Sequence, residues 1–208
     1  MKALLWDMDG TLIDSEPLHE RALVAALTAL GLDPAPGLHD HVIGMSADAV
    51  YDWLCRNSGL DMPFPDWIRL KYSHYMAGVA GLNPMPRALE VWAAAEAAGL
   101  PQAVASNSDR IIVEANLGHM GLTRPGLATV SRNDVRNGKP DPEIYLRAAY
   151  LLGVDPSEAV VVEDSATGAR AGLAAGMQVL VVPYSPVEPP EGARKLADMD
   201  EFLSLIAG

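Results

Sequence analysis

Cysteine is almost missing from this chain: its 208 residues include a single one, Cys55. One cysteine can form neither a disulfide within the chain nor a cysteine-based zinc cluster, and such scarcity is typical of proteins in a reducing compartment. We expect Cys55 to be a small buried side chain.

Basic residues are also few, because 15 Lys and Arg stand against 27 Asp and Glu, which gives a formal net charge of −12. This balance argues against a nucleic-acid partner, which would require clustered Lys and Arg to replace phosphate counterions. The same field repels phosphate esters. Any phosphate site in this chain therefore needs local positive charge from a metal ion, a lysine or a helix N-terminus.

Long apolar runs are missing as well. None approaches the roughly 18 residues that would span a bilayer, and the N-terminus reaches Asp7 before an apolar signal segment could form. We therefore expect a cytoplasmic protein without a membrane partner. For a two-domain chain of this size, a monomer is the default expectation.

Short apolar runs are present instead. Hydrophobic residues make up 50% of the chain and charged residues 20%, which is typical of a compact soluble protein. Helical patterns separate most of the runs, and this alternation predicts an α/β fold with a buried parallel sheet flanked by helices. The predicted strands are Ala3–Trp6, Gln102–Ala105, Leu127–Val130, Ala159–Val162 and Gln178–Val182.

Residues 15–83 differ from the rest, because helical patterns follow one another there without a strong strand. Predicted helices run from Ser15 to Gly31, from Ser46 to Gly59 and over 67–77, and a turn-forming linker covers 81–86. We expect an all-α cap at 15–83, inserted into a core of residues 1–14 and 84–208. In that core, Ser108 is predicted to cap a helix running towards Gly118, and Asp141-Pro142 to begin one that Gly153 ends.

The first predicted strand runs directly into Asp7-Met8-Asp9-Gly10-Thr11. Open α/β sheets bind ligands at the carboxyl ends of their strands, so both acids lie where function is expected. Two acids spaced by two on a strand share a face and repel each other unless a cation pairs with them. Mg²⁺ suits such oxygen ligands, whereas zinc would favour thiols or clustered histidines.

Phosphate esters hydrolyse very slowly without a catalyst. A catalyst therefore benefits from dividing the reaction into two steps, transfer of the phosphoryl group to a carboxylate and its release to water. Asp7 is the predicted nucleophile, and Asp9 the acid/base that protonates the leaving alcohol and later deprotonates water. Gly10 would let the backbone approach the phosphate. A calcium loop or an ordinary turn is the alternative for this motif, but the further ligands and glutamate of an EF-hand are missing.

Three later segments supply the rest of a phosphate site. Ser106-Asn107 follows the second strand and precedes a helix, where a hydroxyl, an amide and backbone N–H groups can bind an anion. Lys139 precedes the helix that starts at Asp141-Pro142, so its ammonium can neutralise phosphoryl oxygens, although a surface lysine is the alternative. Glu163-Asp164 ends a very apolar strand, and paired acids at a buried strand end point to a cation.

Together these four motifs resemble the haloacid dehalogenase superfamily, in particular its phosphatases with a helical cap after the first strand, in the β-phosphoglucomutase-like subgroup. They occur in the family order, and the resemblance spans nearly the whole chain. It implies a Rossmann-like core and the roles given above. It also implies Mg²⁺ bound by Asp7, Asp164 and the Asp9 backbone carbonyl, with Glu163 orienting the ion's waters.

Local departures from the family pattern bear on the substrate. Relatives often have Pro-Gly-Ala where this chain has Pro86-Arg87-Ala88, and mutase-like relatives often have arginine at the position of Ala47 and valine at that of Thr11. Gly44-Met45-Ser46-Ala47 otherwise resembles the cap motif of those relatives. Met45 and Ser46 are therefore candidate substrate contacts, and a simple phosphatase is favoured over a mutase.

Histidines give weaker signals. His19 matches a position that faces the active site in mutase-like relatives and could hydrogen-bond Asp9 or the substrate, although an exposed helix histidine fits almost as well. His39-Asp40-His41 has no third spaced ligand, so we expect a solvated loop there rather than a metal site.

The sequence thus predicts a Mg²⁺-dependent phosphomonoester hydrolase acting on a small phosphorylated metabolite through an aspartyl phosphate. A phosphosugar mutase of the β-phosphoglucomutase type is the nearest alternative. Hydrolytic dehalogenation, which needs neither the second acid nor the metal, and a non-catalytic phosphate-binding module are further ones.

Overall fold

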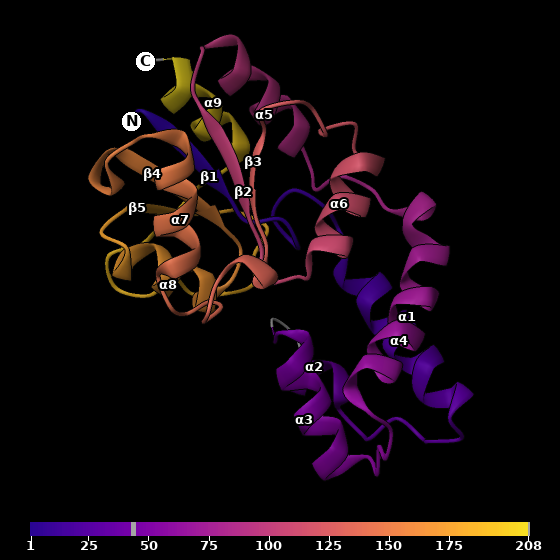
Figure 1. Cartoon of the computed structure of the whole chain (residues 1–208). Coiled ribbons are helices and arrows are strands. Elements are labelled where there is room, and N and C mark those ends of the chain that lie inside the picture. The colour runs from indigo at the N-terminus through magenta and orange to yellow at the C-terminus, as the bar shows by residue number, and fades with distance from the viewer. Residues whose placement is uncertain (43–44, 208) are drawn as a thin grey trace.

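The computed structural model describes residues 1–42 and 45–207 and has a six-stranded sheet at its centre (Figure 1). The strand order is β3-β2-β1-β4-β5-β6, and all neighbouring strands are parallel. The strands are β1 Ala3–Trp6, β2 Gln102–Ala105, β3 Ala128–Val130, β4 Ala159–Glu163, β5 Gln178–Val181 and β6 Arg194–Lys195. The predicted α/β fold is confirmed, and each of the five predicted strands agrees within one residue at either end. The two-residue strand β6 was not predicted.

Helices cover both faces of the sheet, because successive strand residues point to opposite sides. Leu4 and Trp6 of β1 pack with helices α5, α6 and α9, whereas Leu5 packs with α7 and α8. These helices are α5 Ala88–Ala97, α6 Arg110–His119, α7 Glu143–Leu152, α8 Ala166–Ala174 and α9 Met199–Ala207. Each large apolar side chain fully buried here contributes about 1.5–3 kcal/mol, so the central strand is held firmly from both sides.

The described part of the inserted segment contains four α-helices and lies at the lower right in Figure 1. They are α1 Glu16–Ala29, α2 Leu38–Val42, α3 Ala47–Asn57 and α4 Phe64–Gly78. This segment has its own apolar cluster, which includes Leu27, Leu54 and Trp67. Its described residues contain no strand. The predicted division into a core of residues 1–14 and 84–208 and a cap of 15–83 stays a prediction, which this separate cluster supports.

The cap enters and leaves the core at adjacent points. The N–H of Asp14 donates to the carbonyl of Asn83 at 3.0 Å, and the N–H of Met85 donates to the carbonyl of Leu12 at 2.9 Å. The two ends of the insertion therefore lie side by side directly after β1, at the edge of the sheet where the acidic motif begins.

Several local expectations were wrong. Residues 39–41 belong to α2 rather than to a loop, although the side chains of His39 and Asp40 lie outside the described part, as do residues 43–44. Cys55 is exposed, because α3 packs through other residues and this position faces solvent. Helix α6 has Asp109 rather than Ser108 at its N-cap position.

Arg87 occupies the position where relatives often have glycine, and it adopts the left-handed conformation at φ +59°. A non-glycine residue pays roughly 1–2 kcal/mol for this backbone. Its guanidinium bonds Glu90 at 3.2 Å and Asp200 at 2.5 Å, which offsets part of that penalty. Helix α5 is therefore preceded by a residue in the left-handed conformation that glycine adopts more readily than arginine.

Candidate active site

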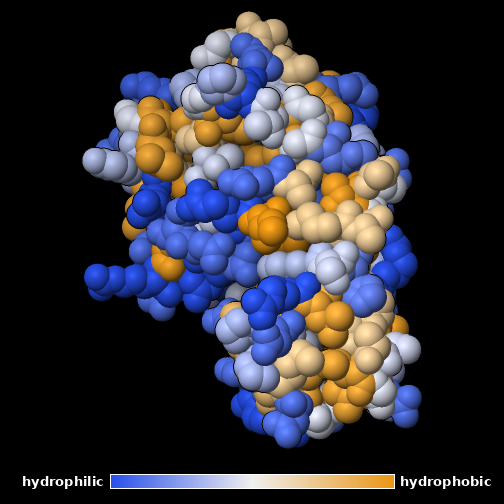
Figure 2. All heavy atoms as spheres, turned by 45° about the vertical axis from the view of Figure 1, so that its right-hand side comes forward, coloured by the Kyte–Doolittle hydropathy of each residue, from blue (hydrophilic) through white to orange (hydrophobic). Residues whose placement is uncertain are grey.

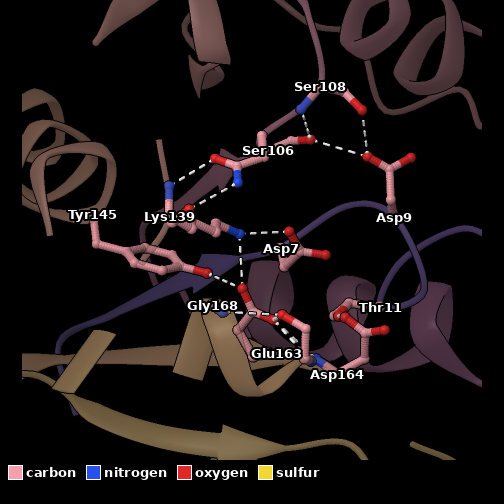
Figure 3. A network of polar contacts seen from close by, with 12 residues as sticks. Asp7, Asp9, Thr11, Ser106, Ser108, Lys139, Tyr145, Glu163, Asp164 and Gly168 are labelled. Carbon is pink, nitrogen blue, oxygen red and sulfur yellow. Dashed lines mark hydrogen bonds and ion pairs between the residues drawn. The ribbon is translucent and has the colours of Figure 1, made fainter. Parts of the chain in front are cut away.

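Side chains from the carboxyl ends of β1, β2 and β4 gather at one edge of the sheet (Figure 3). A cleft of about 600 Å³ lies there, between the sheet and the cap. Asp7, Asp9, Lys139 and Asp164, which are far apart in the sequence, all line it.

Lys139 joins two of the acids. Its Nζ lies 2.5 Å from Asp7 Oδ1 and 2.7 Å from Glu163 Oε1, and 4.8 Å from the centre of the Tyr145 ring. Burial alone would lower the pKa of Lys139, but the two carboxylates raise it well above its ordinary value. Lys139 is therefore a fixed ammonium beside Asp7 and not a surface lysine.

Glu163 is fully buried at the end of β4 and is surrounded by donors. Oε1 accepts from Lys139 and from the Tyr145 hydroxyl at 2.7 Å. Oε2 accepts from the N–H of Asp164 at 3.1 Å and from the N–H and hydroxyl of Ser165 at 3.1 and 2.9 Å. A Cβ added at Gly168 would overlap this carboxylate, so only glycine fits there. The geometry makes Glu163 an anchor for Lys139.

The carboxylates of Asp7, Glu163 and Asp164 are crowded, with one oxygen of each within 4.8 Å of the others. Burial raises the pKa of Asp164 to about 8, and Glu163 adds to the rise. Burial likewise raises the pKa of Asp7, against the lowering effect of Lys139. Three ionised carboxylates beside one ammonium leave two negative charges, which a divalent cation would balance. The oxygen donors fit a hard ion of the Mg²⁺ type.

Asp9 points away from this group, although it follows so closely in the sequence (Figure 3). It accepts hydrogen bonds from the hydroxyls of Ser15 at 2.5 Å, Ser106 at 3.0 Å and Ser108 at 2.8 Å. His19 Nε2 lies 3.5 Å from Oδ1. Burial alone would raise the pKa of Asp9, but His19 and the hydroxyl donors lower it to about 2. The expected shared face does not persist, because β1 ends before the motif and the strand period no longer applies.

Gly10 follows Asp9 with φ +79°, and a Cβ at this position would overlap the carboxylate of Asp164. Glycine is thus required both by the backbone conformation and by the close approach of the β4 acid. Thr11 Oγ1 donates to the same acid at 3.3 Å.

Asn107 fixes the backbone of Lys139 through its side chain. Its Oδ1 accepts from the Lys139 N–H at 2.8 Å, and its Nδ2 donates to the Lys139 carbonyl at 3.3 Å. The predicted phosphate-binding pair Ser106-Asn107 therefore has its side-chain groups on Asp9 and on Lys139. A phosphate contact by either residue stays a prediction.

Of the three candidate cap residues, two line the cleft. The ring of His19 lies 4.5 Å from that of Tyr75, tilted by 38°, and its Nε2 lies 3.5 Å from Asp9. Met45 is 43% exposed. Ser46 precedes α3 as its N-cap residue and is not among the described residues of the cleft wall. Gly44 of the same motif lies outside the described residues.

Sequence reasoning missed four residues of this site: Ser15, Ser108, Tyr145 and Lys71. Both serines were interpreted only as helix starts, and a second donor in Ser106-Asn107-Ser108 was a usable signal. Lys71 lies on α4 in the cleft wall, 5.8 Å from the Trp67 ring centre, and burial lowers its pKa to about 8. Tyr145 and Lys71 stand on ordinary amphipathic helices, so nothing in the sequence distinguished them from core or surface residues.

A family model described as haloacid dehalogenase-like hydrolase matches residues 1–176. Hexitol phosphatase A of Escherichia coli K12 is 32% identical over 189 residues, which cover 91% of this chain and 86% of that protein. The protein SUPPRESSOR OF QUENCHING 1, chloroplastic, of Arabidopsis thaliana is 35% identical over 188 residues, which cover 88% of this chain but only 18% of that protein.

Solved structures give the same result. CbbY from Rhodobacter sphaeroides in complex with phosphate has a TM-score of 0.86 and 30% identity, over 99% of this chain and 96% of that one. A variant of the same protein was solved with xylulose 1,5-bisphosphate, with a TM-score of 0.86 and 29% identity over 97% of this chain and 96% of that one. The likeness thus includes the sheet with its flanking helices and the inserted helices together.

Proposed function

Because the chain belongs to the haloacid dehalogenase-like hydrolase family, we propose that it hydrolyses phosphate monoesters of small metabolites, of the sugar or polyol class, through an aspartyl phosphate on Asp7. The single observation that carries this proposal is the contact of Lys139 with both Asp7 and Glu163 in the cleft. It fixes a nucleophilic carboxylate beside an ammonium that can neutralise phosphoryl oxygens.

In the first step, an Asp7 carboxylate oxygen attacks phosphorus, the ester P–O bond breaks and the alcohol leaves with a proton. The ammonium of Lys139, which lies beside this carboxylate, neutralises negative charge on the phosphoryl oxygens. Burial favours the protonated acid at Asp7, so the neighbouring ammonium is needed to keep the nucleophile ionised. Asp7 and Asp164 would hold a Mg²⁺ ion together with the Asp9 backbone carbonyl, and bound Mg²⁺ would supply further neutralisation of phosphoryl charge.

In the second step, water attacks the phosphorus of the aspartyl phosphate and Asp9 takes the proton of that water. The P–O bond to Asp7 breaks, which releases inorganic phosphate and restores the Asp7 carboxylate. The hydroxyl donors and His19 keep Asp9 ionised in the present arrangement, which suits this role as a base. To act first as an acid, Asp9 must carry a proton, which requires that some of these donors move away. His19 stands on the cap, so cap motion relative to the core would change the protonation of Asp9.

The named relatives support a phosphatase, and the mutase alternative has no stronger support. SUPPRESSOR OF QUENCHING 1 adds no argument about substrate because this chain matches only a small part of it. Within the described residues, none of the helices is both long and apolar enough to cross a bilayer. A cytoplasmic location and a monomeric state complete the proposal.

The test is turnover of p-nitrophenyl phosphate with Mg²⁺ by the Asp7→Asn variant. We expect kcat to fall by at least about 10³-fold, because the amide cannot form the intermediate. Asp14→Asn makes the same change at an exposed position seven residues later and should retain activity. Undiminished activity of Asp7→Asn would end the proposal. Glucose 1-phosphate separates the alternatives, since a phosphatase releases phosphate whereas a mutase yields an isomer.

A further inference from the structure

The segment that follows β5 contributes Pro186 and Val187 to the wall of the cleft. Two side chains just before them, Tyr184 and Ser185, reach the acidic end of the sheet. In the space-filling view, the sheet with its flanking helices forms the upper lobe, and the inserted helices extend into the lower one (Figure 2). Because this segment continues a strand of the sheet, its contacts with the acidic motifs lie within the upper lobe.

Ser185 extends the pairing of β4 with β5 by one residue. The backbone pairing ends where the N–H of Val182 donates to the carbonyl of Glu163 at 2.8 Å. The next carbonyl, that of Asp164, accepts a hydrogen bond from the hydroxyl of Ser185. Ser185 is buried, and buried backbone carbonyls require a partner of this kind. The hydroxyl thus fixes the backbone of Asp164 at the point where β5 no longer does.

Asp164 is held at three points. Its N–H donates to Glu163 Oε2 at 3.1 Å, and its Oδ1 accepts from Thr11 Oγ1 at 3.3 Å. The bond from Ser185 to its carbonyl is the third. The N–H and the carbonyl flank the Cα, so Glu163 and Ser185 together set the direction in which the carboxylate leaves the backbone.

Tyr184 acts on the same carboxylate through Thr11. Its hydroxyl donates to the carbonyl of Thr11 at 2.8 Å. Thr11 is fully buried directly after the turn at Gly10, and its own hydroxyl donates to Asp164. Two consecutive residues, Tyr184 and Ser185, therefore hold both the acid at the end of β4 and the residue of the β1 motif that contacts it.

The segment is itself anchored by the two-residue strand β6, which pairs with β5. Lys195 of β6 donates from Nζ to the carbonyl of Ser185 at 2.6 Å. On the other side, Ser185 Oγ accepts from the N–H of Val187 at 3.1 Å, and Val187 lines the cleft. One buried hydroxyl therefore joins the edge of the sheet, the Asp164 backbone and part of the cleft wall.

We propose, resting on the Mg²⁺ site proposed above at Asp7 and Asp164, that Ser185 and Tyr184 are positioning residues for this ion. Both act through Asp164: they hold its carboxylate in the orientation in which it meets the carboxylate of Asp7. Loss of a partner that orients a metal ligand typically weakens metal affinity by about 10- to 100-fold, because the ligand must then be ordered when the ion binds.

The experiment measures the Kd of Mg²⁺ alone by isothermal titration calorimetry. Ser185→Ala and Tyr184→Phe each remove one hydroxyl and keep the rest of the side chain. We expect the Kd to rise about tenfold or more for Ser185→Ala. For Tyr184→Phe we expect a rise of at least about threefold, because its bond acts on Asp164 only through Thr11.

Each variant has a matched control with the same kind of hydrogen bond elsewhere. The hydroxyl of Ser204 also donates to an aspartate carbonyl, that of Asp200, at 2.9 Å. The hydroxyl of Tyr51 donates to the carbonyl of Met62 at 2.8 Å, the same distance as in the Tyr184 bond. Neither Ser204 nor Tyr51 is among the described residues of the cleft wall. Ser204→Ala and Tyr51→Phe should therefore keep the Kd of Mg²⁺ within about twofold of the parent value.

A second readout separates positioning from general damage. With p-nitrophenyl phosphate, the kcat of Ser185→Ala should recover to within about threefold of the parent value at saturating Mg²⁺, because every ligand of the ion is retained. A loss of kcat that saturating Mg²⁺ does not recover would overturn the proposal.

The two proposals fail differently. If a folded variant binds Mg²⁺ with the parent Kd while Asp164→Asn binds it far more weakly, the positioning role of the replaced residue is overturned and the proposed phosphatase stands. If Asp164→Asn binds Mg²⁺ as tightly as the parent protein, the ion binds elsewhere and both the cation site and this inference are overturned. If Ser185→Ala does not fold, Tyr184→Phe, which retains the ring, decides the question.

Discussion

Replacing Lys139 with methionine tests how strongly the centre of the site depends on one ammonium. The substitution retains the apolar stem and removes the charge that lies 2.5 Å from Asp7 and 2.7 Å from Glu163. All three side chains are buried, with exposures of 3%, 10% and 0% in these pairs. Removing one partner of a buried pair leaves uncompensated charge and typically costs about 3–5 kcal/mol. We expect a loss of this size in the free energy of unfolding.

Urea denaturation in EDTA measures it. For a chain of this length the dependence of stability on urea is about 2–3 kcal/mol per M, so the midpoint should fall by about 1–2.5 M. Lys2→Met is the matched control, because Lys2 pairs with Glu158 at 2.7 Å but both side chains are largely exposed. An exposed ion pair contributes little because water screens it, so the midpoint of this variant should fall by less than about 0.5 M. Equal shifts in the two variants would refute the reasoning.

The stability loss of Lys139→Met should depend on pH, with a definite sign. Burial already raises the pKa of Asp7, and Lys139 opposes that rise, so the variant should raise it further. An acid whose folded pKa lies above its unfolded value favours the folded state at low pH, and that contribution is lost as pH rises through the folded pKa. The deficit of Lys139→Met should therefore be larger at pH 8 than at pH 5.5. In the parent protein the raised pKa of Lys139 keeps its contribution fully present at both values, since both lie below the unfolded pKa of lysine.

Three further changes test the surroundings of Glu163 and the cation site. Gly168→Ala should lower the free energy of unfolding, measured in urea, by about 3 kcal/mol or more and reduce activity, because the new Cβ would displace the Glu163 carboxylate. Gly81→Ala is the control: its Cβ would meet open space, so the free energy of unfolding should stay within about 0.5 kcal/mol of the parent value. Tyr145→Phe removes a donor at 2.7 Å from the buried Glu163 and should cost about 1–3 kcal/mol by the same measurement; an unchanged midpoint would contradict the anchoring role. Mg²⁺ at 100 times its Kd should raise the Tm of the parent protein by about 5–10 °C and leave the Tm of Asp164→Asn nearly unchanged. Similar shifts in the two proteins would mean that the ion binds elsewhere.

Sequence patterns were sufficient for the sheet and for the family. Strands such as β4 are unbroken apolar runs that end in acids, and a strand buried on both faces leaves that signature in a sequence. The predicted haloacid dehalogenase membership is confirmed by the family model that matches residues 1–176. Its motifs lie at those strand ends, which a parallel sheet brings to one edge.

The misses have physical reasons. Strand β6 has two residues and helix α2 has five, so neither is long enough to show a period. Cys55 was expected to be buried from its residue type alone, whereas α3 packs inward through the i, i+4 row of Val50 and Leu54, to which Cys55 does not belong. The hydroxyls around Asp9 come from both the β2 end and the start of α1, and only the folded chain brings these segments together.

The paired backbone at residues 12–14 and 83–85 has a consequence for how such an enzyme can diversify. The stem that carries the inserted helices is closed by the core's own main chain, independently of what the insertion contains. A foreign helical module could be spliced between these two points without shifting the register of β1, provided that it again covers the apolar surface next to the stem. Substrate selectivity and phosphoryl-transfer chemistry could then evolve separately, because new inserted helices would change which alcohols are accepted while the catalytic residues of the core stay the same.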